Sequence, residues 1–168
     1  MLCSCLDSDS DGPCKLFAGP VACFTNGDWE ELVSKRGVRC CISILPIGRP
    51  GVSRADVLDP LPRYHRILHA WDDTVLQPDV IRAVIDLEVS TFIHCNSGEN
   101  RSSMLAACWL LWHTQPALAV NGEKAWKEVL ASRAKTLGHE PKTRPAMHEN
   151  VKKFADYLTV LATTTGAK

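Results

Sequence analysis

The chain has 168 residues, with 19 lysines and arginines against 19 aspartates and glutamates, so its formal net charge is zero. This balance provides no general attraction to nucleic acid or to an anionic membrane surface. The length suits one domain with one hydrophobic core and is short for two. No apolar run in the sequence is long enough to span a bilayer.

The cysteine content and the N-terminal segment indicate whether the protein is secreted or stays inside the cell. Eight cysteines would suggest disulfides in a small secreted protein, but the N-terminus carries aspartates where a secretory signal has basic residues. We therefore expect reduced cysteines and a cytoplasmic, intracellular location. Residues 1–14 are rich in serine, aspartate and cysteine, and we expect them to be disordered. One domain is expected over residues 15–162, followed by a flexible tail over residues 163–168.

The first half of the chain predicts strands separated by a helix. Residues 15–20 are expected to form the opening strand. Asp28 is expected to cap a short helix that ends at Gly37. The apolar run over residues 38–45 predicts a strand buried on both faces, as in a parallel sheet, and residues 66–71 predict the next strand.

The second half predicts mainly helices. Pro78 is expected to open one helix, whose inward face would be formed by Val80, Ile81, Val84 and Ile85. Helical spacing of apolar side chains predicts two further helices near the C-terminus. The positions that carry this spacing are Ala125, Trp126, Val129 and Leu130 in one helix, and Met147, Val151, Phe154, Leu158 and Leu161 in the other. Strands that alternate with helices predict an α/β fold with a mostly parallel sheet covered on both faces.

The most informative segment of the chain spans residues 92–102 and reads FIHCNSGENRS. A run of strand-favouring residues ends in His94-Cys95, and an apolar helix pattern begins at Met104. A strand that ends in a short loop before a helix directs backbone N–H groups and the positive end of the helix dipole at one point. The sequence therefore predicts an anion site with Cys95 at its floor.

The side chains of this segment suit attack on phosphorus. A cysteine that faces a helix N-terminus ionises readily, and its thiolate is a nucleophile. Arg101 carries a planar fork that fits two phosphoryl oxygens. Ser102 is placed to donate its hydroxyl to the departing sulfur, and His94 is expected to fix the loop through hydrogen bonds. Gly98 lets the backbone curl around the anion.

The pattern Cys-x5-Arg-Ser with a preceding histidine resembles the signature of the cysteine-dependent protein tyrosine phosphatases, and the chain resembles their small dual-specificity branch. The resemblance implies a single-domain tyrosine phosphatase-like fold and hydrolysis of phosphoesters through a phospho-cysteine intermediate, with no metal and no cofactor. It also implies that the loop binds the substrate phosphate. The expected phosphate-binding residues are Asn96, Ser97, Gly98, Glu99, Asn100 and Arg101.

The resemblance further implies an aspartic acid, on a loop before the nucleophile, that protonates the leaving oxygen. Asp73 is the preferred candidate because it is followed by Thr74, as in the dual-specificity pattern of aspartate followed by a small hydroxyl residue. Asp72 is the alternative, because Trp71-Asp72 is similar to the tryptophan-containing acid loop of the larger tyrosine phosphatases. A third interpretation is that both carboxylates only cap the helix that begins near Pro78.

The substrate expected from the sequence is a phosphoprotein carrying phosphotyrosine and phosphoserine or phosphothreonine. The variable positions of the loop contain no lysine, and Glu99 would repel a highly charged head group. Two alternatives stay open: a non-protein phosphate such as a phosphoinositide, a nucleotide or an RNA 5′-phosphate, and a phosphate-binding module with little turnover. Apart from the RNA 5′-phosphate named above as a possible substrate, we expect no nucleic-acid partner. The sequence does not indicate the oligomeric state.

Overall fold

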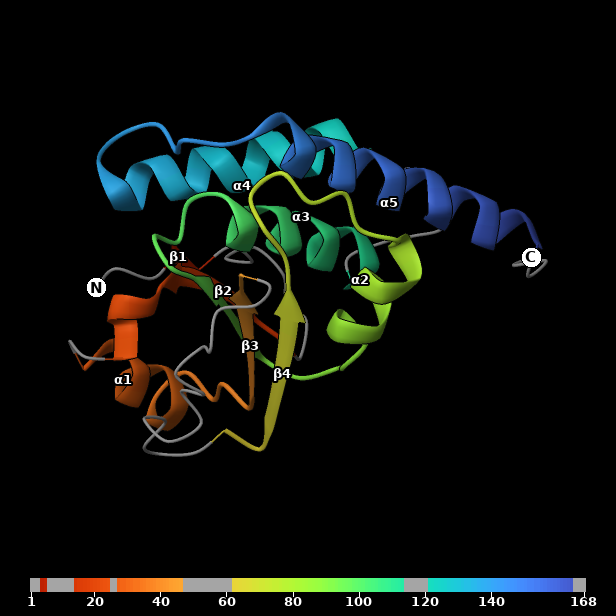
Figure 1. Cartoon of the computed structure of the whole chain (residues 1–168). Coiled ribbons are helices and arrows are strands. Elements are labelled where there is room, and N and C mark those ends of the chain that lie inside the picture. Colours follow the sequence, from red (N-terminus) through yellow and green to blue (C-terminus); the bar gives the residue numbers. More distant parts are fainter. Residues whose placement is uncertain (1–3, 6–13, 25–26, 47–61, 114–120, 165–168) are drawn as a thin grey trace.

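A computed structural model of the chain describes residues 4–5, 14–24, 27–46, 62–113 and 121–164. Its sheet has five strands in the order β1-β2-β5-β3-β4 (Figure 1). The strands are β1 (Ser4–Cys5), β2 (Leu16–Pro20), β3 (Cys40–Leu45), β4 (Tyr64–His69) and β5 (Thr91–Cys95). The pairs β2–β5, β5–β3 and β3–β4 are parallel, whereas β1 runs antiparallel to β2. The mostly parallel sheet predicted from the sequence is confirmed.

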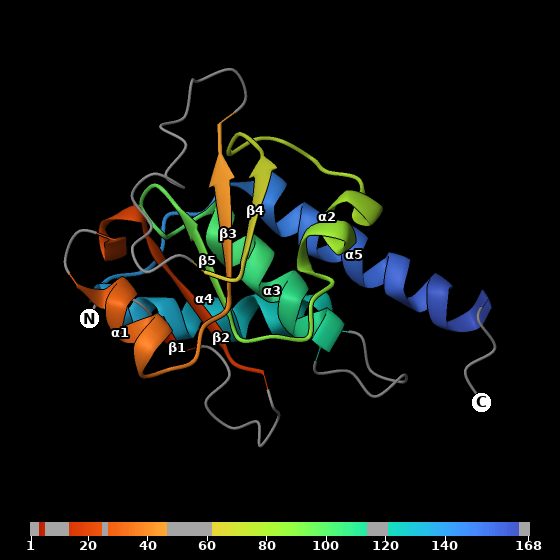
Figure 2. The ribbon, with the colours of Figure 1, turned by 90° about the horizontal axis from the view of Figure 1, so that it is seen from below.

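Helices cover both faces of this sheet. They are the 3-10 helix η1 (Val21–Phe24), α1 (Asp28–Ser34), α2 (Pro78–Ile85), α3 (Arg101–His113), α4 (Gly122–Leu137) and α5 (Pro145–Thr164). Helices α2 to α5 lie on one face and α1 lies on the other (Figure 1). Figure 2 shows α3 lying along the strands, and α3 contacts β2 and β5 on one side and α4 and α5 on the other.

The alternation of side chains along the strands builds two hydrophobic cores, because neighbouring residues of a strand point to opposite faces. In β5, Phe92 packs into the core under α1, and Ile93 packs into the larger core under α3. Cys95 falls on the same face as Ile93 and belongs to the larger core. The nucleophile candidate therefore lies on the face of the sheet that carries α3.

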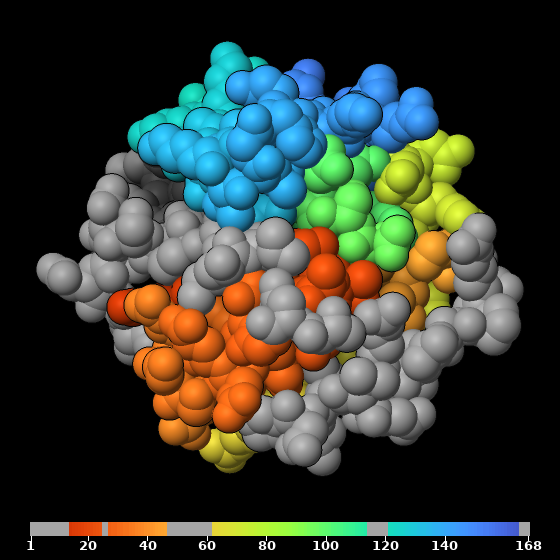
Figure 3. Space-filling view, turned by 90° about the vertical axis from the view of Figure 1, so that its left-hand side faces the viewer, coloured from red at the N-terminus to blue at the C-terminus, as the bar shows by residue number. Residues whose placement is uncertain are grey.

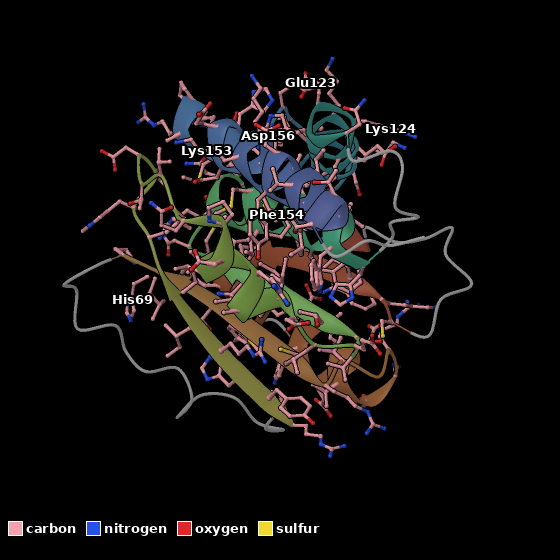
Figure 4. The ribbon with its side chains drawn as sticks, turned by 90° about the vertical axis from the view of Figure 1, so that its right-hand side faces the viewer. His69, Glu123, Lys124, Lys153, Phe154 and Asp156 are labelled. Atoms are coloured by element: carbon pink, nitrogen blue, oxygen red, sulfur yellow. The ribbon has the colours of Figure 1, made fainter. Side chains whose placement is uncertain are left out.

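Helix α3 is the centre of the molecule, and it is buried along nearly its whole length. Residues 101 to 111 are all buried, which is the behaviour of a helix with neighbours on every side. The outer layer is polar: Figure 4 shows Glu123 and Lys124 of α4 and Lys153 and Asp156 of α5 at the surface. Phe154 of α5 points inward and is fully buried. No helix among the described residues is long and apolar enough to cross a membrane.

Some element boundaries differ from those predicted. Strand β4 begins at Tyr64 rather than at residue 66, because parallel pairing with β3 starts where Cys40 meets Tyr64. It ends before Trp71, whose N–H donates to Thr74 Oγ1 (2.8 Å) and so turns the chain. Strand ends are thus set by the partner strand and by a local turn, and neither is visible in the hydrophobic pattern.

Two side-chain assignments also need correction. The residue that caps α1 is Gly27, with φ 83°, and Asp28 is the first residue of the helix. Val80 is 43% exposed and therefore does not face inward, whereas Ile81 and Ile85 are buried as expected. The remaining predicted inward position, Val84, packs partly buried against the core.

The described residues near the two termini can be compared with the predicted limits of the domain. Residues 4–5, inside the segment expected to be disordered, form β1, because the edge of β2 offers free main-chain groups to pair with. The rest of that segment up to residue 13, and the tail from residue 165, lie outside the described residues. The predicted limits at residues 15 and 162 stay predictions.

Candidate active site

The candidate active site lies at the carboxyl end of β5, between β2 and β3. Parallel α/β sheets bind ligands at this end of their strands. Cys95 is the last residue of β5, and Arg101 is the first residue of α3, so the loop of residues 96–100 connects a central strand to the central helix. The strand–loop–helix arrangement predicted from the sequence is present.

The first half of the loop has its carbonyls directed away from the loop interior. The carbonyl of Asn96 accepts a hydrogen bond from the Val21 N–H (3.1 Å). The carbonyl of Gly98 accepts one from Nε of Arg133 (3.0 Å). Both donors belong to other elements that flank the loop, η1 and α4.

The carbonyls of the second half of the loop also accept hydrogen bonds, here from donors in α3. The Glu99 carbonyl accepts a hydrogen bond from Ser103 Oγ (2.6 Å), and the Asn100 carbonyl accepts one from the Met104 N–H (3.1 Å). In a planar trans peptide the N–H points opposite to the carbonyl. The N–H groups of these peptides are therefore directed into the loop, beside the N-terminus of α3. Such groups attract anions, and the expected anion site here stays a prediction.

Gly98 is required by the shape of this loop. Its φ is +75°, in the left-handed region that side chains disfavour. A Cβ at this position would lie 2.5 Å from the nitrogen of Pro20 and 2.6 Å from the carbonyl carbon of Gly19. Because these are backbone atoms that cannot move aside, only glycine lets the loop close onto the end of β2.

The nucleophile candidate lies at the bottom of the loop, in contact with Ser102. Cys95 is 2% exposed, and its Sγ is hydrogen-bonded to Ser102 Oγ at 3.4 Å. When the sulfur is ionised, the hydroxyl is the donor of this pair. The two side chains expected to cooperate in forming and releasing a phospho-cysteine are thus in contact.

Arg101 is oriented by the ends of two neighbouring strands. Its Nη1 donates to the carbonyls of Ile44 and Ala70, both at 3.4 Å, and its side chain is only 10% exposed. Its Nε lies 2.8 Å from Oδ1 of Asp72. A guanidinium held in this way presents a fixed positive charge beside the loop.

The two candidate acids take different places on the same turn. The Trp71 carbonyl accepts a hydrogen bond from the Thr74 N–H (3.2 Å), which holds the turn closed. Both side chains are exposed, but the Asp72 carboxylate contacts Arg101 and lines the hollow beside the loop, whereas Asp73 is not among the lining residues. In this conformation the geometry favours Asp72, and the preference for Asp73 stays a prediction.

Sequence reasoning missed the residue that anchors this acid turn. Asn150 of α5 is fully buried, donates to the carbonyl of Thr74 (2.8 Å) and accepts from the N–H of Leu76 (2.7 Å). A signal was present, because Asn150 is a polar residue between Met147 and Phe154 on the apolar face of its helix.

A hollow of about 420 Å³ opens beside the phosphate-binding loop. Figure 3 shows the green surface of the loop bordered by the blue chain that leads into α5. Lys142 and Arg144 of that chain line the hollow together with Ser97, Glu99 and Asn100. The N–H of Lys142 donates to Glu99 Oε2 and the N–H of Arg144 to Asn100 Oδ1, both at 2.9 Å. These two bonds fix the basic segment to the loop.

His94 lies on the other face of the sheet from Cys95. Its ring is 1% exposed, and its Nε2 shares a 2.6 Å hydrogen bond with Ser43 Oγ. Ser43 Oγ is also bonded to Nε2 of His65 (2.9 Å), and burial lowers the pKa of His65. His94 therefore ties β5 to β3 and, through Ser43, to β4, and its expected role in fixing the loop stays a prediction.

The surroundings of the other thiols suggest which cysteine reacts with peroxide. Burial raises the pKa of Cys40 to about 11 and that of Cys41 and Cys108 still further above the usual range. These three thiols stay protonated at neutral pH, and the thiolate is the reactive form. We expect mass spectrometry after mild peroxide treatment to find Cys95 oxidised to sulfenic acid before Cys40, Cys41 or Cys108, with activity restored by a thiol reductant.

A Cys95→Ala protein serves as the control for this oxidation, since Cys40, Cys41 and Cys108 should stay unmodified at the same peroxide dose. Modification of a different cysteine first, with activity retained, would contradict the assignment of Cys95 as the activated thiol.

No cluster of three or more histidine, cysteine, aspartate or glutamate side chains suited to a metal ion occurs within the described ranges. The expectation that the reaction needs no metal stays a prediction.

Comparison with known proteins identifies the fold. No protein-family model matches the sequence, and no curated protein sequence matches it. Solved structures do match across nearly the whole chain. The structure of PTPMT1 in complex with PI(5)P has a TM-score of 0.68 and 18% identity, covering 96% of this chain and 99% of that one. Human DUSP28 has a TM-score of 0.60 and 17% identity, covering 94% and 95%.

A third similar structure is that of a phosphatase-like protein. The human tyrosine phosphatase-like serine/threonine/tyrosine-interacting protein matches with a TM-score of 0.58 and 18% identity, covering 85% of this chain and 93% of that one. These similarities show that the chain has the fold of the cysteine-dependent tyrosine and dual-specificity phosphatases.

Proposed function

We propose that the protein is a phosphatase that hydrolyses phosphomonoesters through a phospho-cysteine intermediate. The observation that carries the proposal is the geometry at the end of β5. Cys95 ends β5 in contact with Ser102, the carbonyls of the loop that follows are bonded to outside donors, and the guanidinium of Arg101 lies at the start of α3, held by the carbonyls of Ile44 and Ala70. This arrangement combines a nucleophile with donors that stabilise charge on a transferring phosphoryl group.

In the first step the Cys95 thiolate attacks phosphorus, and the bond between phosphorus and the ester oxygen breaks. Arg101 and the loop N–H groups hold the other phosphoryl oxygens. We propose Asp72 as the acid that transfers a proton to the leaving oxygen. The phosphate dianion takes the place of the Asp72 carboxylate at Arg101, because the guanidinium fork fits two phosphoryl oxygens.

In the second step water attacks the phospho-cysteine, and the S–P bond breaks. Asp72, now deprotonated, accepts a proton from this water, and inorganic phosphate is released. The hydroxyl of Ser102 donates a hydrogen bond to the departing sulfur, which regenerates the thiolate. The two steps together consume one water and return every group to its starting state.

The preferred substrate is a phosphoprotein carrying phosphotyrosine and phosphoserine or phosphothreonine. Glu99 lines the hollow and disfavours a highly charged head group, and the loop itself carries no lysine. A specific observation favours a phosphoinositide as the second candidate: Lys142 and Arg144 line the same hollow and form no ion pair within the described part of the chain. PTPMT1, which has the same fold, binds PI(5)P in its crystal.

A substrate comparison on purified protein tests the proposal. We expect hydrolysis of p-nitrophenyl phosphate and a higher kcat/KM for phosphotyrosine and phosphothreonine peptides than for PI(5)P in mixed micelles. A higher kcat/KM for PI(5)P would select the second candidate. If inorganic phosphate binds but none of the esters is hydrolysed, the protein is a phosphate-binding module with little turnover.

A further inference from the structure

Among the residues that the structure describes, Arg133 is the most deeply buried charged side chain, at 0% exposure. It lies on the apolar face of α4, four residues after Val129 and seven after Trp126, both buried as well. An arginine is almost never fully buried unless its charge and its N–H groups have partners. The partners of Arg133 therefore indicate why an arginine occupies a core position.

Arg133 joins the phosphate-binding loop to the sheet. Its Nε donates to the carbonyl of Gly98 (3.0 Å), and its Nη1 donates to the carbonyl of Ala18 in β2 (2.9 Å). The loop makes its closest backbone approach to β2 at this same point, where Gly98 meets Gly19 and Pro20. One guanidinium thus holds the loop and the strand that it packs on.

The first of these bonds determines how one loop amide is directed. Because the peptide between Gly98 and Glu99 is planar and trans, drawing the Gly98 carbonyl toward Arg133 turns the Glu99 N–H the opposite way, into the loop. The guanidinium also places a buried positive charge behind the anion site, where the low dielectric strengthens its effect.

We propose that Arg133 is a positioning residue of the phosphate site, which aims the Glu99 N–H at the bound phosphoryl group by holding the Gly98 carbonyl. The inference rests on the proposed function, since it specifies one donor of the proposed phosphate site. Arg133 itself lies behind the loop and acts through the backbone of Gly98 and Glu99.

Two substitutions of Arg133 distinguish the effect of its two hydrogen bonds from the effect of its positive charge. Arg133→Lys keeps a cation but cannot bridge two carbonyls with a planar fork, and Arg133→Met removes both. The matched control is Lys135→Met, which removes an exposed cation two residues further along the same helix. We expect kcat for p-nitrophenyl phosphate to fall by about 10²-fold in both Arg133 variants, as for loss of one oxyanion donor, and to stay unchanged in the control.

A second readout does not need turnover. Iodoacetamide alkylates the Cys95 thiolate, and inorganic phosphate bound in the loop should protect it. We expect the half-protecting phosphate concentration to rise by roughly tenfold or more in Arg133→Lys and in Arg133→Met. If Arg133→Met does not fold, as judged by circular dichroism, Arg133→Lys decides alone.

The outcomes distinguish this inference from the proposed function. A folded Arg133→Lys protein with wild-type kcat and wild-type phosphate protection would overturn the positioning role. Wild-type protein that phosphate protects but that hydrolyses no ester would overturn the phosphatase assignment, and weaker protection in the Arg133 variants would still support the inference.

Discussion

Replacement of Cys95 by serine is expected to abolish turnover, with a loss in kcat on the order of 10⁶-fold, as when other enzymes lose their nucleophile. A serine hydroxyl stays protonated at neutral pH and is a far weaker nucleophile toward phosphorus than a thiolate. The loop N–H groups and Arg101 are unchanged by the substitution, so the phosphate site should persist. Binding of inorganic phosphate, measured by calorimetry, should therefore remain close to that of the wild-type protein.

The matched control is Cys108→Ala, which removes a fully buried thiol from α3 without touching the loop. This protein should lose some thermal stability, because it leaves a small cavity, but keep its kcat. Phosphate release by Cys95→Ser at more than a trace of the wild-type rate would exclude the phospho-cysteine mechanism. Loss of phosphate binding in a folded Cys95→Ser protein would contradict the proposed anion site.

Asp72→Asn is expected to lower the hydrolysis of phenyl phosphate by about 10²–10⁴-fold and that of an activated nitrophenyl ester much less. Phenoxide is a strongly basic leaving group that needs a proton in the transition state, whereas a nitrophenolate leaves without one. The substitution should also flatten the basic limb of the pH profile of kcat, where loss of the acid's proton normally slows the reaction. Because it removes the ion pair with Arg101, phosphate binding should be as tight as in the wild-type protein or tighter.

The neighbouring Asp73→Asn variant is the control for the acid, because it changes the same turn by the same chemistry one residue further on. We expect only a few-fold change in kcat, with no dependence on the leaving group. The opposite result would be a kcat that depends steeply on the leaving group in Asp73→Asn and weakly in Asp72→Asn. That result would support Asp73 as the acid, as the sequence predicted. Weak dependence in both variants would place the acid outside this turn.

Features contained in one contiguous stretch of chain could be predicted from the sequence. The strand, the loop and the helix from Phe92 to Trp112 follow one another, so hydrophobic periodicity and the spacing of Cys95 and Arg101 are enough to place them. The buried apolar face of α5 was predicted for the same reason. Where a boundary depends on a partner, as at the start of β4, the sequence pattern was wrong by two residues.

The tertiary structure decided which side chains from distant segments support the loop. Asp72 and Asp73 are adjacent in sequence, and only the turn anchored by Asn150 directs one of them at Arg101. Asn150 lies 76 residues from Thr74, and Arg133 lies 35 residues from Gly98, so no local pattern links them. The sequence by itself determined the chemistry of the loop, because its groups are fixed by local backbone geometry. The three-dimensional packing determined which carboxylate faces the site and how the loop amides are aimed, because hydrogen bonds to main-chain carbonyls depend on where folding brings each helix.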